Sequence, residues 1–144
     1  MKRSLFAFII VTLLFYSCGS RNENNLSEDD LRYINEIIPL EENESIELFE
    51  TNGGLKGYKT AGNFITNKRL SHYWLDGKND EVHSLKYDQI ASLKAVDRTK
   101  AATYASYLEV YGANQYNFKI YVGADSARTW NFFNKAIENW NNKK

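Results

Sequence analysis

Few residues in this chain are of the types that catalyse reactions or bind metal ions. The chain has two histidines, His72 and His83, and a single cysteine, Cys18. Each histidine lies in a segment with strand-like alternation, and neither is accompanied by cysteine or carboxylate ligands at a typical metal-site spacing. Because zinc sites generally draw three or four such ligands, the sequence predicts no metal site and no metal cofactor.

Neighbouring carboxylates are the other candidates for acid–base chemistry. The pairs Asp29-Asp30, Glu41-Glu42 and Asp80-Glu81 fall in expected turns or in the first turn of a helix, where acidic residues are common for structural reasons. The motifs Gly-x-Ser-x-Gly and His-Glu-x-x-His are absent, as is a phosphate-binding glycine loop. We therefore expect a protein without enzymatic activity, and an enzyme with an unrecognised site ranks third among the functions considered below.

The N-terminal segment has the pattern of a signal peptide. Lys2 and Arg3 precede an apolar run from Leu5 to Tyr16 that only Thr12 interrupts. As a helix this run would be about 18 Å long, well short of the roughly 30 Å core of a bilayer. The pattern predicts a signal peptide over residues 1–17 rather than a membrane-spanning helix.

Cys18 follows this segment directly, in the sequence Ser17-Cys18-Gly19. The junction resembles the lipobox of bacterial lipoproteins, in which the cysteine receives a diacylglyceryl group and becomes the new N-terminus. The resemblance implies lipidation at Cys18, attachment to a membrane and a location in the bacterial cell envelope. Gly19 stands where an aspartate retains some lipoproteins at the inner membrane, which favours the outer membrane. An ordinary cleavage site beside an unmodified thiol, or a cytosolic cysteine, remains the alternative.

The rest of the chain reads as one domain on a tether. Residues 18–26 are small or polar without periodicity, which is typical of a flexible tether, and residues 27–144 are long enough for one hydrophobic core. Without a second cysteine, this core has to hold the fold together with no internal disulfide. After loss of Lys2 and Arg3, 16 basic and 18 acidic residues remain, so net charge gives no reason to expect a nucleic-acid partner.

The pattern predicts a short helix, a series of strands and a final helix. Ser27 to Ile38 is helical, with Ser27 as its cap, an apolar face of Leu31, Ile34, Ile37 and Ile38, and an end at Pro39. Asp125 to Trp140 is amphipathic, with Asp125 or Ser126 as its cap and Trp130, Phe133, Ile137 and Trp140 as its apolar stripe. Period-two alternation and turn residues predict strands near Ser45–Thr51, Leu55–Thr60, Asn63–Thr66, Leu70–Leu75, Val82–Tyr87, Ser92–Val96, Thr103–Tyr111 and Gln115–Val122.

Two local motifs fit this order of elements. Residues Gly62 to Tyr73, around Thr66-Asn67-Lys68-Arg69, and residues Leu85 to Leu93, around Tyr87-Asp88-Gln89-Ile90, resemble hairpin and turn motifs of bacterial pleckstrin-homology-like and GRAM-like domains. The resemblance covers roughly Glu44 to Trp140. It implies a mainly β fold, a bent antiparallel barrel of about seven strands whose open end is closed by the C-terminal amphipathic helix. The N-terminal helix lies outside that family core.

Membrane-facing members of that fold class meet acidic headgroups through basic loops between early strands. Here those loops offer Lys56, Lys59, Lys68 and Arg69 as possible ligand-binding residues. Residues 51–144 hold 14 basic and 8 acidic residues, whereas residues 21–50 hold 2 basic and 10 acidic residues. Either the basic residues form a face for an anionic ligand, or the acidic segment neutralises them within the molecule.

The last two expected strands have the pattern of a hairpin, in which one strand shares a face of Tyr104, Leu108 and Val110 and the next shares a face of Tyr116, Phe118, Ile120 and Val122. Three tyrosines point away from this predicted core face. These are Tyr107, Tyr111 and Tyr121, and as exposed aromatics they are possible partner-binding residues. The sequence thus favours a non-enzymatic envelope lipoprotein that acts as a protein-interaction or assembly module with an envelope protein partner. A binding module for an anionic lipid or small ligand is the alternative.

Overall fold

The computed structural model describes residues 26–51, 54–101, 105–123 and 125–143, without the side chains of residues 54–56. The predicted signal peptide, Cys18, most of the tether and Tyr104 lie outside the described residues, as does the side chain of Lys56. The elements in chain order are α2 (Glu28–Ile37), β1 (Ile46–Glu50), the 3₁₀ helix η3 (Gly54–Lys59), β2 (Ala61–Thr66), β3 (Arg69–Trp74), β4 (Glu81–Lys86), the 3₁₀ turn η4 (Tyr87–Gln89), β5 (Ile90–Val96), β6 (Ser106–Gly112), β7 (Asn117–Val122) and α3 (Ser126–Lys143).

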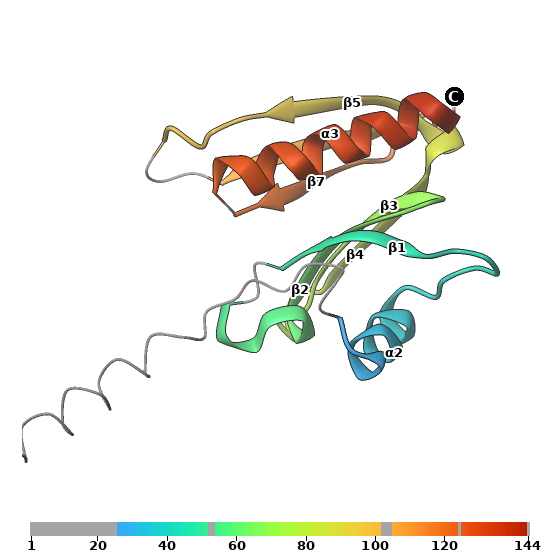
Figure 1. The fold of residues 1–144 in the computed structure, drawn as a ribbon, viewed down its shortest axis with the longest axis vertical. Coiled ribbons are helices and arrows are strands. Elements are labelled where there is room, and N and C mark those ends of the chain that lie inside the picture. The colour runs from blue at the N-terminus through green and yellow to red at the C-terminus, as the bar shows by residue number, and fades with distance from the viewer. Residues whose placement is uncertain (1–25, 52–53, 102–104, 124, 144) are drawn as a thin grey trace, which may run out of the picture.

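The strands form two antiparallel sheets in layers (Figure 1). Sheet A has the order β1-β2-β3-β4, and sheet B has the order β5-β6-β7. Helix α2 lies on the side of sheet A that faces away from sheet B, and α3 runs along sheet B (Figure 1). The described part of the chain contains no helix that is long and apolar enough to cross a membrane.

The N-terminal helix begins where the sequence predicts. The Ser27 side chain accepts a hydrogen bond from the Asp30 N–H at 3.2 Å, and the Asp30 carboxylate accepts one from the Ser27 N–H at 3.0 Å. This reciprocal capping box satisfies two amides at the helix start. Ile34 and Ile38 are buried as expected, but Leu31 is 39% exposed, so its assignment to the buried face is wrong. Asp30, whose carboxylate bonds to the Ser27 N–H, is buried in the first turn.

One predicted strand is also wrong. Residues Leu55–Thr60 were expected to be extended, but residues 54–59 form η3. Gly57 has φ +54° and ψ −136°, a conformation that side chains disfavour, and it breaks any continuous strand. The remaining predicted strands correspond to β1–β7, which confirms about seven strands; residues 102–104, at the start of the predicted Thr103–Tyr111 strand, lie outside the described residues.

Sheet A is buried on both faces, which explains why β2 is fully buried. On one face, Phe49, Phe64 and Tyr73 pack with Ile34 and Ile38 of α2. Tyr73 lies directly over Gly62, where an added Cβ would come within 2.6 Å of the ring. The N-terminal helix therefore has a defined role: it covers a second core that the main domain would otherwise leave open.

The main core lies between the two sheets and α3. It contains Leu48, Ile65, Leu70 and Leu85 from sheet A, together with alternating residues of sheet B and one side of α3. The predicted inward alternation of the last hairpin is confirmed, since Leu108, Val110, Phe118, Ile120 and Val122 are buried. Tyr116, which was assigned to the same face, is 38% exposed at the hairpin turn.

The sheets do not close into a barrel. Between β4 and β5 the chain turns through η4, where Tyr87 is buried and its hydroxyl donates to the Thr66 carbonyl at 2.8 Å. On the other side, β2 meets β7 through a side chain, since Asn63 Nδ2 donates to the Tyr121 carbonyl at 2.7 Å. At both corners the two sheets are joined by side-chain hydrogen bonds and not by a ladder of backbone hydrogen bonds. The structure is therefore an open sandwich instead of the expected closed barrel.

Helix α3 closes the core with a stripe that differs from the predicted one. Asp125 caps it, as expected, by accepting from the Arg128 N–H at 3.0 Å. Thr129, Phe132, Phe133 and Ala136 are its buried residues, whereas Trp130 is 42% exposed. The helix is rotated relative to the predicted stripe, so Phe132 takes the place expected of Trp130. Trp140 is partly buried and donates from Nε1 to the Ile90 carbonyl at 3.0 Å.

Candidate functional site

The basic turn between β2 and β3 is engaged by the acidic segment that follows α2. Arg69 donates to Glu44 from Nε at 2.7 Å and from Nη2 at 2.5 Å. The Glu44 side chain has no exposed surface, and it also accepts from the Thr66 hydroxyl at 2.7 Å and from the Glu41 N–H at 2.8 Å. The Glu44 carboxylate therefore accepts hydrogen bonds from the Arg69 guanidinium, the Thr66 hydroxyl and the Glu41 N–H.

Electrostatics agree with this geometry. Burial alone would raise the pKa of Glu44, but the hydrogen bonds from Arg69, the Glu41 backbone and Thr66 outweigh it and hold the pKa at about 2. Arg69 also donates to the Pro39 carbonyl at 3.0 Å. At neutral pH this is a closed ion pair that fixes segment 39–44 to the hairpin.

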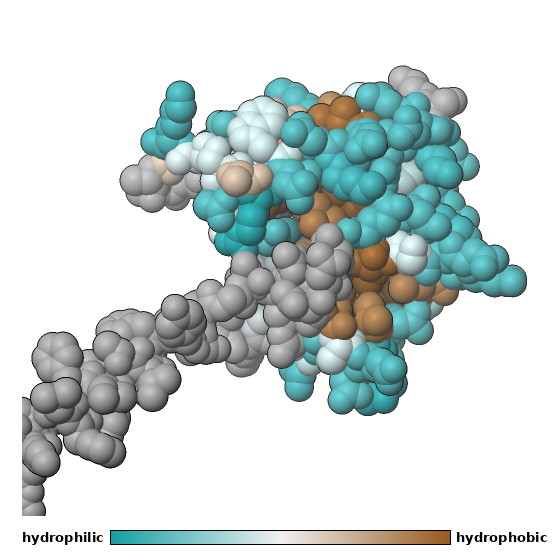
Figure 2. Space-filling view, in the orientation of Figure 1, coloured by the Kyte–Doolittle hydropathy of each residue, from teal (hydrophilic) through white to brown (hydrophobic). Residues whose placement is uncertain are grey.

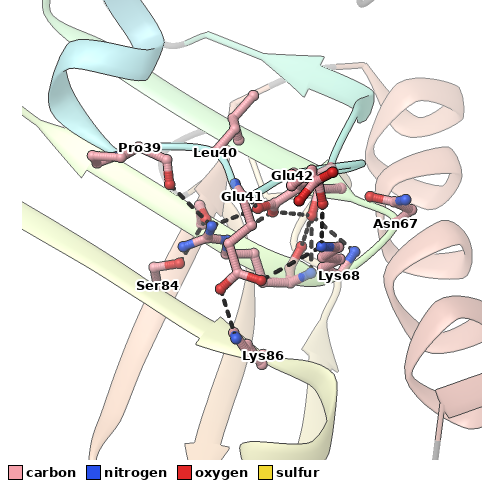
Figure 3. A network of polar contacts seen from close by, with 12 residues as sticks. Pro39, Leu40, Glu41, Glu42, Asn67, Lys68, Ser84 and Lys86 are labelled. Atoms are coloured by element: carbon pink, nitrogen blue, oxygen red, sulfur yellow. Dashed lines mark hydrogen bonds and ion pairs between the residues drawn. The ribbon is translucent and has the colours of Figure 1, made fainter.

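The lysines of the same region are paired in a similar way (Figure 3). Glu41 lies between Lys68 and Lys86, with oxygen-to-nitrogen distances of 3.5 and 2.6 Å. Lys68 also donates to the Glu42 carbonyl at 2.6 Å. Of the two readings of the sequence, the contacts match the second, in which the acidic segment neutralises these cations within the molecule.

The four predicted basic residues do not converge on one site. Lys59 precedes β2, whereas Lys68 and Arg69 follow it, so the six residues of the strand separate them by roughly 20 Å. Lys59 is exposed, and its carbonyl accepts from the Tyr33 hydroxyl at 3.0 Å. The side chain of Lys56 lies outside the described part of the chain.

The two histidines, by contrast, lie side by side. They are cross-strand partners on β3 and β4, with ring centroids 6.0 Å apart and planes at 8°. Asn63 on β2 continues the row, and its Oδ1 lies 2.7 Å from His72 Nδ1. Because the Asn63 amide nitrogen donates to the Tyr121 carbonyl, its oxygen must accept, so the hydrogen-bond network assigns the proton of neutral His72 to Nδ1.

His72 is held in the neutral state. Burial and, to a smaller extent, the neighbouring His83 lower its pKa from 6.5 to about 4, against a weaker opposite effect of Glu81. His83 contacts the Tyr116 hydroxyl through Nδ1, and its Nε2 lies 3.7 Å from the Glu81 carboxylate. It also stacks on Phe118 with ring centroids 5.0 Å apart. This row joins sheet A to β7 by polar and stacking contacts.

The sequence analysis missed this cluster, including Glu81, which lies two residues before His83 on the same strand face. A prediction of the strand register, which places His72 opposite His83, would have found the cluster. Within the described residues, no group of three histidine, cysteine or carboxylate side chains is arranged to hold a metal ion. The arrangement serves to join the two sheets at their open corner.

The three tyrosines lie on the outer face of sheet B. Register places Tyr107 opposite Tyr121, and their ring centroids are 5.6 Å apart. Tyr121 is 46% exposed, and Tyr107 and Tyr111 are half-buried. We call this outward side of the sheet the outer face; it comprises Ser92, Lys94, Val96, Tyr107, Glu109, Tyr111, Asn117, Lys119 and Tyr121.

Charged residues surround these tyrosines. Glu109 accepts from the Tyr111 hydroxyl at 2.8 Å, and Lys94 and Lys119 approach it to 3.4 and 3.6 Å. These contacts, the Tyr111 hydrogen bond first, lower the pKa of Glu109. In the view of Figure 2, apolar surface gathers in the middle, between the part formed by sheet B with α3 and the part formed by sheet A with α2.

Comparison with known proteins identifies the fold. No family model and no curated protein matches the chain. Among solved structures, it is similar to the crystal structure of a DUF1696 family protein with a pleckstrin-homology domain from Shewanella loihica PV-4, with a TM-score of 0.50 and 18% identity over 77% of this chain and 97% of that chain. The chain has a pleckstrin-homology-like fold. The predicted fold class is thereby confirmed, with two open sheets in place of a closed barrel. At 18% sequence identity, this similarity shows the fold alone.

Proposed function

We propose that the protein is a non-enzymatic lipoprotein of the bacterial cell envelope whose pleckstrin-homology-like domain binds another protein. The proposal rests on the basic β2–β3 turn, whose cations are already paired with carboxylates of the same chain. Arg69 is closed onto the buried Glu44, and Lys68 and Lys86 share Glu41. Binding of an anionic headgroup there would have to displace carboxylates already bound in the same chain.

The outer face of sheet B supports the same proposal. It is exposed and aromatic, and its tyrosines provide rigid contact area at little cost in conformational entropy. The acidic first turn of α2, with Glu28 and Asp29 exposed, lies next to the tether and would be repelled by an anionic membrane surface. A lipid on Cys18 would then supply the membrane attachment, and the domain would be available to a partner.

Lipidation is tested by labelling cells with a fatty-acid analogue. We expect the wild-type chain to incorporate the label and Cys18→Ala to lose it, since the only thiol is then absent. Ser17→Ala is the matched control, because it keeps a small residue before the cysteine. A wild-type chain without label would refute the lipoprotein part of the proposal.

The alternative of an anionic-lipid binder is tested with Cys18→Ala in the full chain, which removes the lipid but leaves the domain intact. We expect no salt-sensitive sedimentation with phosphatidylglycerol vesicles, because the β2–β3 cations are already paired, and binding through the apolar residues 5–16 would not depend on salt in this way. Salt-sensitive sedimentation that is lost on reversing Lys59, Lys68 and Arg69 to Glu would favour the alternative and reject the proposed function.

A further inference from the structure

The outer face of sheet B has a net positive charge around its aromatic centre. Lys94 and Lys119 lie on the face, and the Arg98 guanidinium is 5.5 Å from the centroid of the Tyr107 ring. Glu109 is the face's one carboxylate among the described residues. Asp97, next to Arg98, bonds instead to the Thr99 N–H and the Ser106 hydroxyl. Because these partners of Asp97 are neutral, its carboxylate keeps its charge, and three cations against two carboxylates leave an excess of one positive charge.

The cations are held close to the tyrosine rings. Lys119 Nζ lies 4.7 Å from the centroid of the Tyr107 ring, and Arg98 approaches the same ring. Cation–π contacts of this kind orient long side chains that would otherwise be flexible. Glu109 adds to this order by binding both Lys94 and Lys119. The face therefore presents an exposed Tyr121 beside Tyr107, with Arg98 and Lys119 close to the Tyr107 ring.

A surface with tyrosines and nearby cations is complementary to a partner that carries carboxylates beside an apolar side chain. Aromatic residues are enriched among the anchors of protein interfaces, and surrounding charges select partners of opposite sign. A basic partner would be repelled by the excess positive charge. A partner segment rich in Asp and Glu would place carboxylates against Lys94, Arg98 and Lys119 while covering Tyr121.

We propose that the outer face of sheet B docks an acidic segment of another protein, with Tyr107 and Tyr121 as its centre and Lys94, Arg98 and Lys119 as the contacts for carboxylates. This inference rests on the proposed function, and it names the chemistry of the partner. Electrostatic attraction would bring the acidic segment to the face, and the tyrosines would provide its apolar contact.

The test uses the full-length protein and a fluorescently labelled oligoglutamate peptide as the probe, with oligolysine as the opposite charge. We expect salt-sensitive binding of oligoglutamate only. Lys119→Ala should weaken it roughly threefold, while Lys78→Ala, which removes an exposed lysine in the β3–β4 turn of sheet A, should leave it unchanged. Equal effects of the two variants, or no binding at low salt, would overturn the proposal.

A second pair of variants protects the test against changes in folding. Tyr121→Ala removes an aromatic side chain that is 46% exposed, and Trp130→Ala removes one that is 42% exposed on α3. We expect only Tyr121→Ala to weaken oligoglutamate binding, by roughly fivefold or more, with both melting temperatures nearly unchanged. Equal binding by both variants would contradict the assigned face.

Phosphatidylglycerol vesicles distinguish the other source of negative charge. Vesicle binding that depends on Lys119 in Cys18→Ala, without peptide binding, would show a lipid surface and overturn the inference. Failure of the inference is separate from failure of the proposed function. The proposed function stands if the full chain takes up the fatty-acid label through Cys18 and the Cys18→Ala variant shows no salt-sensitive binding to vesicles. This holds even if oligoglutamate does not bind.

Discussion

At the scale of single residues, two buried titratable groups connect the sheets to their surroundings. Glu44 is ionised and fully paired with Arg69, whereas His72 is neutral and bonded to Asn63. Folding lowers the pKa of both groups, from 4.5 to about 2 for the acid Glu44 and from 6.5 to about 4 for the base His72. The consequences for stability therefore fall in different pH ranges, and each can be measured separately.

Arg69→Met should destabilise the protein by about 3 to 5 kcal/mol, because it leaves the buried Glu44 carboxylate without its cation. Urea denaturation of the variant measures this change in unfolding free energy. Lys86→Met is the matched control: its pair with Glu41 is 46% and 40% exposed, so the cost should be less than about 1 kcal/mol. Similar costs for the two variants would mean that Glu44 and Arg69 are not a buried pair.

The stability contributed by Glu44 should depend on pH. Its carboxylate has a lower pKa in the folded protein, about 2, than its ordinary value of 4.5. The unfolded state therefore takes up the proton first, and stability is lost as the pH falls from 4.5 towards 2. Arg69→Met should lack this loss, and a variant with the same acid dependence as wild type would contradict the assignment.

His72 should produce a second acid-sensitive range at higher pH. Its pKa falls from 6.5 to about 4 on folding, so the unfolded state binds the proton first between these values. Stability should drop by roughly 3 kcal/mol as the pH falls from 6.5 to 4. His72→Asn, which retains a short side-chain donor facing Asn63, should remove this slope in urea titrations. An unchanged slope would assign it to another group.

The sequence analysis could reach some of these residues but not their partners. Ser27 and Asp125 were predicted as helix caps because a cap depends on residues within one turn. The pairs Glu44–Arg69 and His72–His83 join positions 25 and 11 residues apart. Such pairs depend on strand register and on the path of segment 39–44, neither of which local periodicity specifies.

At the scale of elements, strand alternation was predicted better than helix rotation. The inward residues of β6 and β7 follow a period of two that tolerates no other assignment. In α3, Trp130 and Phe132 are both large and apolar and only two positions apart, so two neighbouring stripes fit the sequence. The core selects the stripe with Phe132, because Phe132 and Phe133 together fill the space between the sheets.

Two alanine substitutions in α3 test this rotation. Phe132→Ala should cost about 3 to 5 kcal/mol, because it leaves a cavity in the main core. Trp130→Ala should cost roughly 1 kcal/mol or less, because the side chain is 42% exposed and its ring meets Phe133 edge-on. Urea denaturation compares them in one helix, and the reverse order would restore the stripe predicted from sequence.

At the scale of the whole molecule, the layers give the domain two different sides. Helix α2 and the start of the described chain lie on one side of sheet A, and sheet B lies on the other (Figure 1). The described chain begins on the acidic α2 side, and the aromatic outer face of sheet B lies away from that side. An anchored domain of this design would turn its tyrosines towards partners rather than towards the bilayer.

The central claim, a lipid-anchored domain that binds a protein rather than a lipid, is tested most directly by photocrosslinking in whole cells. A photoreactive amino acid is placed in the full chain at Tyr121, and in a matched chain at Lys59, where the alternative expects a lipid. We expect a discrete protein adduct from position 121 that disappears when Cys18→Ala prevents lipidation, and none from position 59. Lipid adducts at position 59 without a protein adduct at position 121 would contradict it.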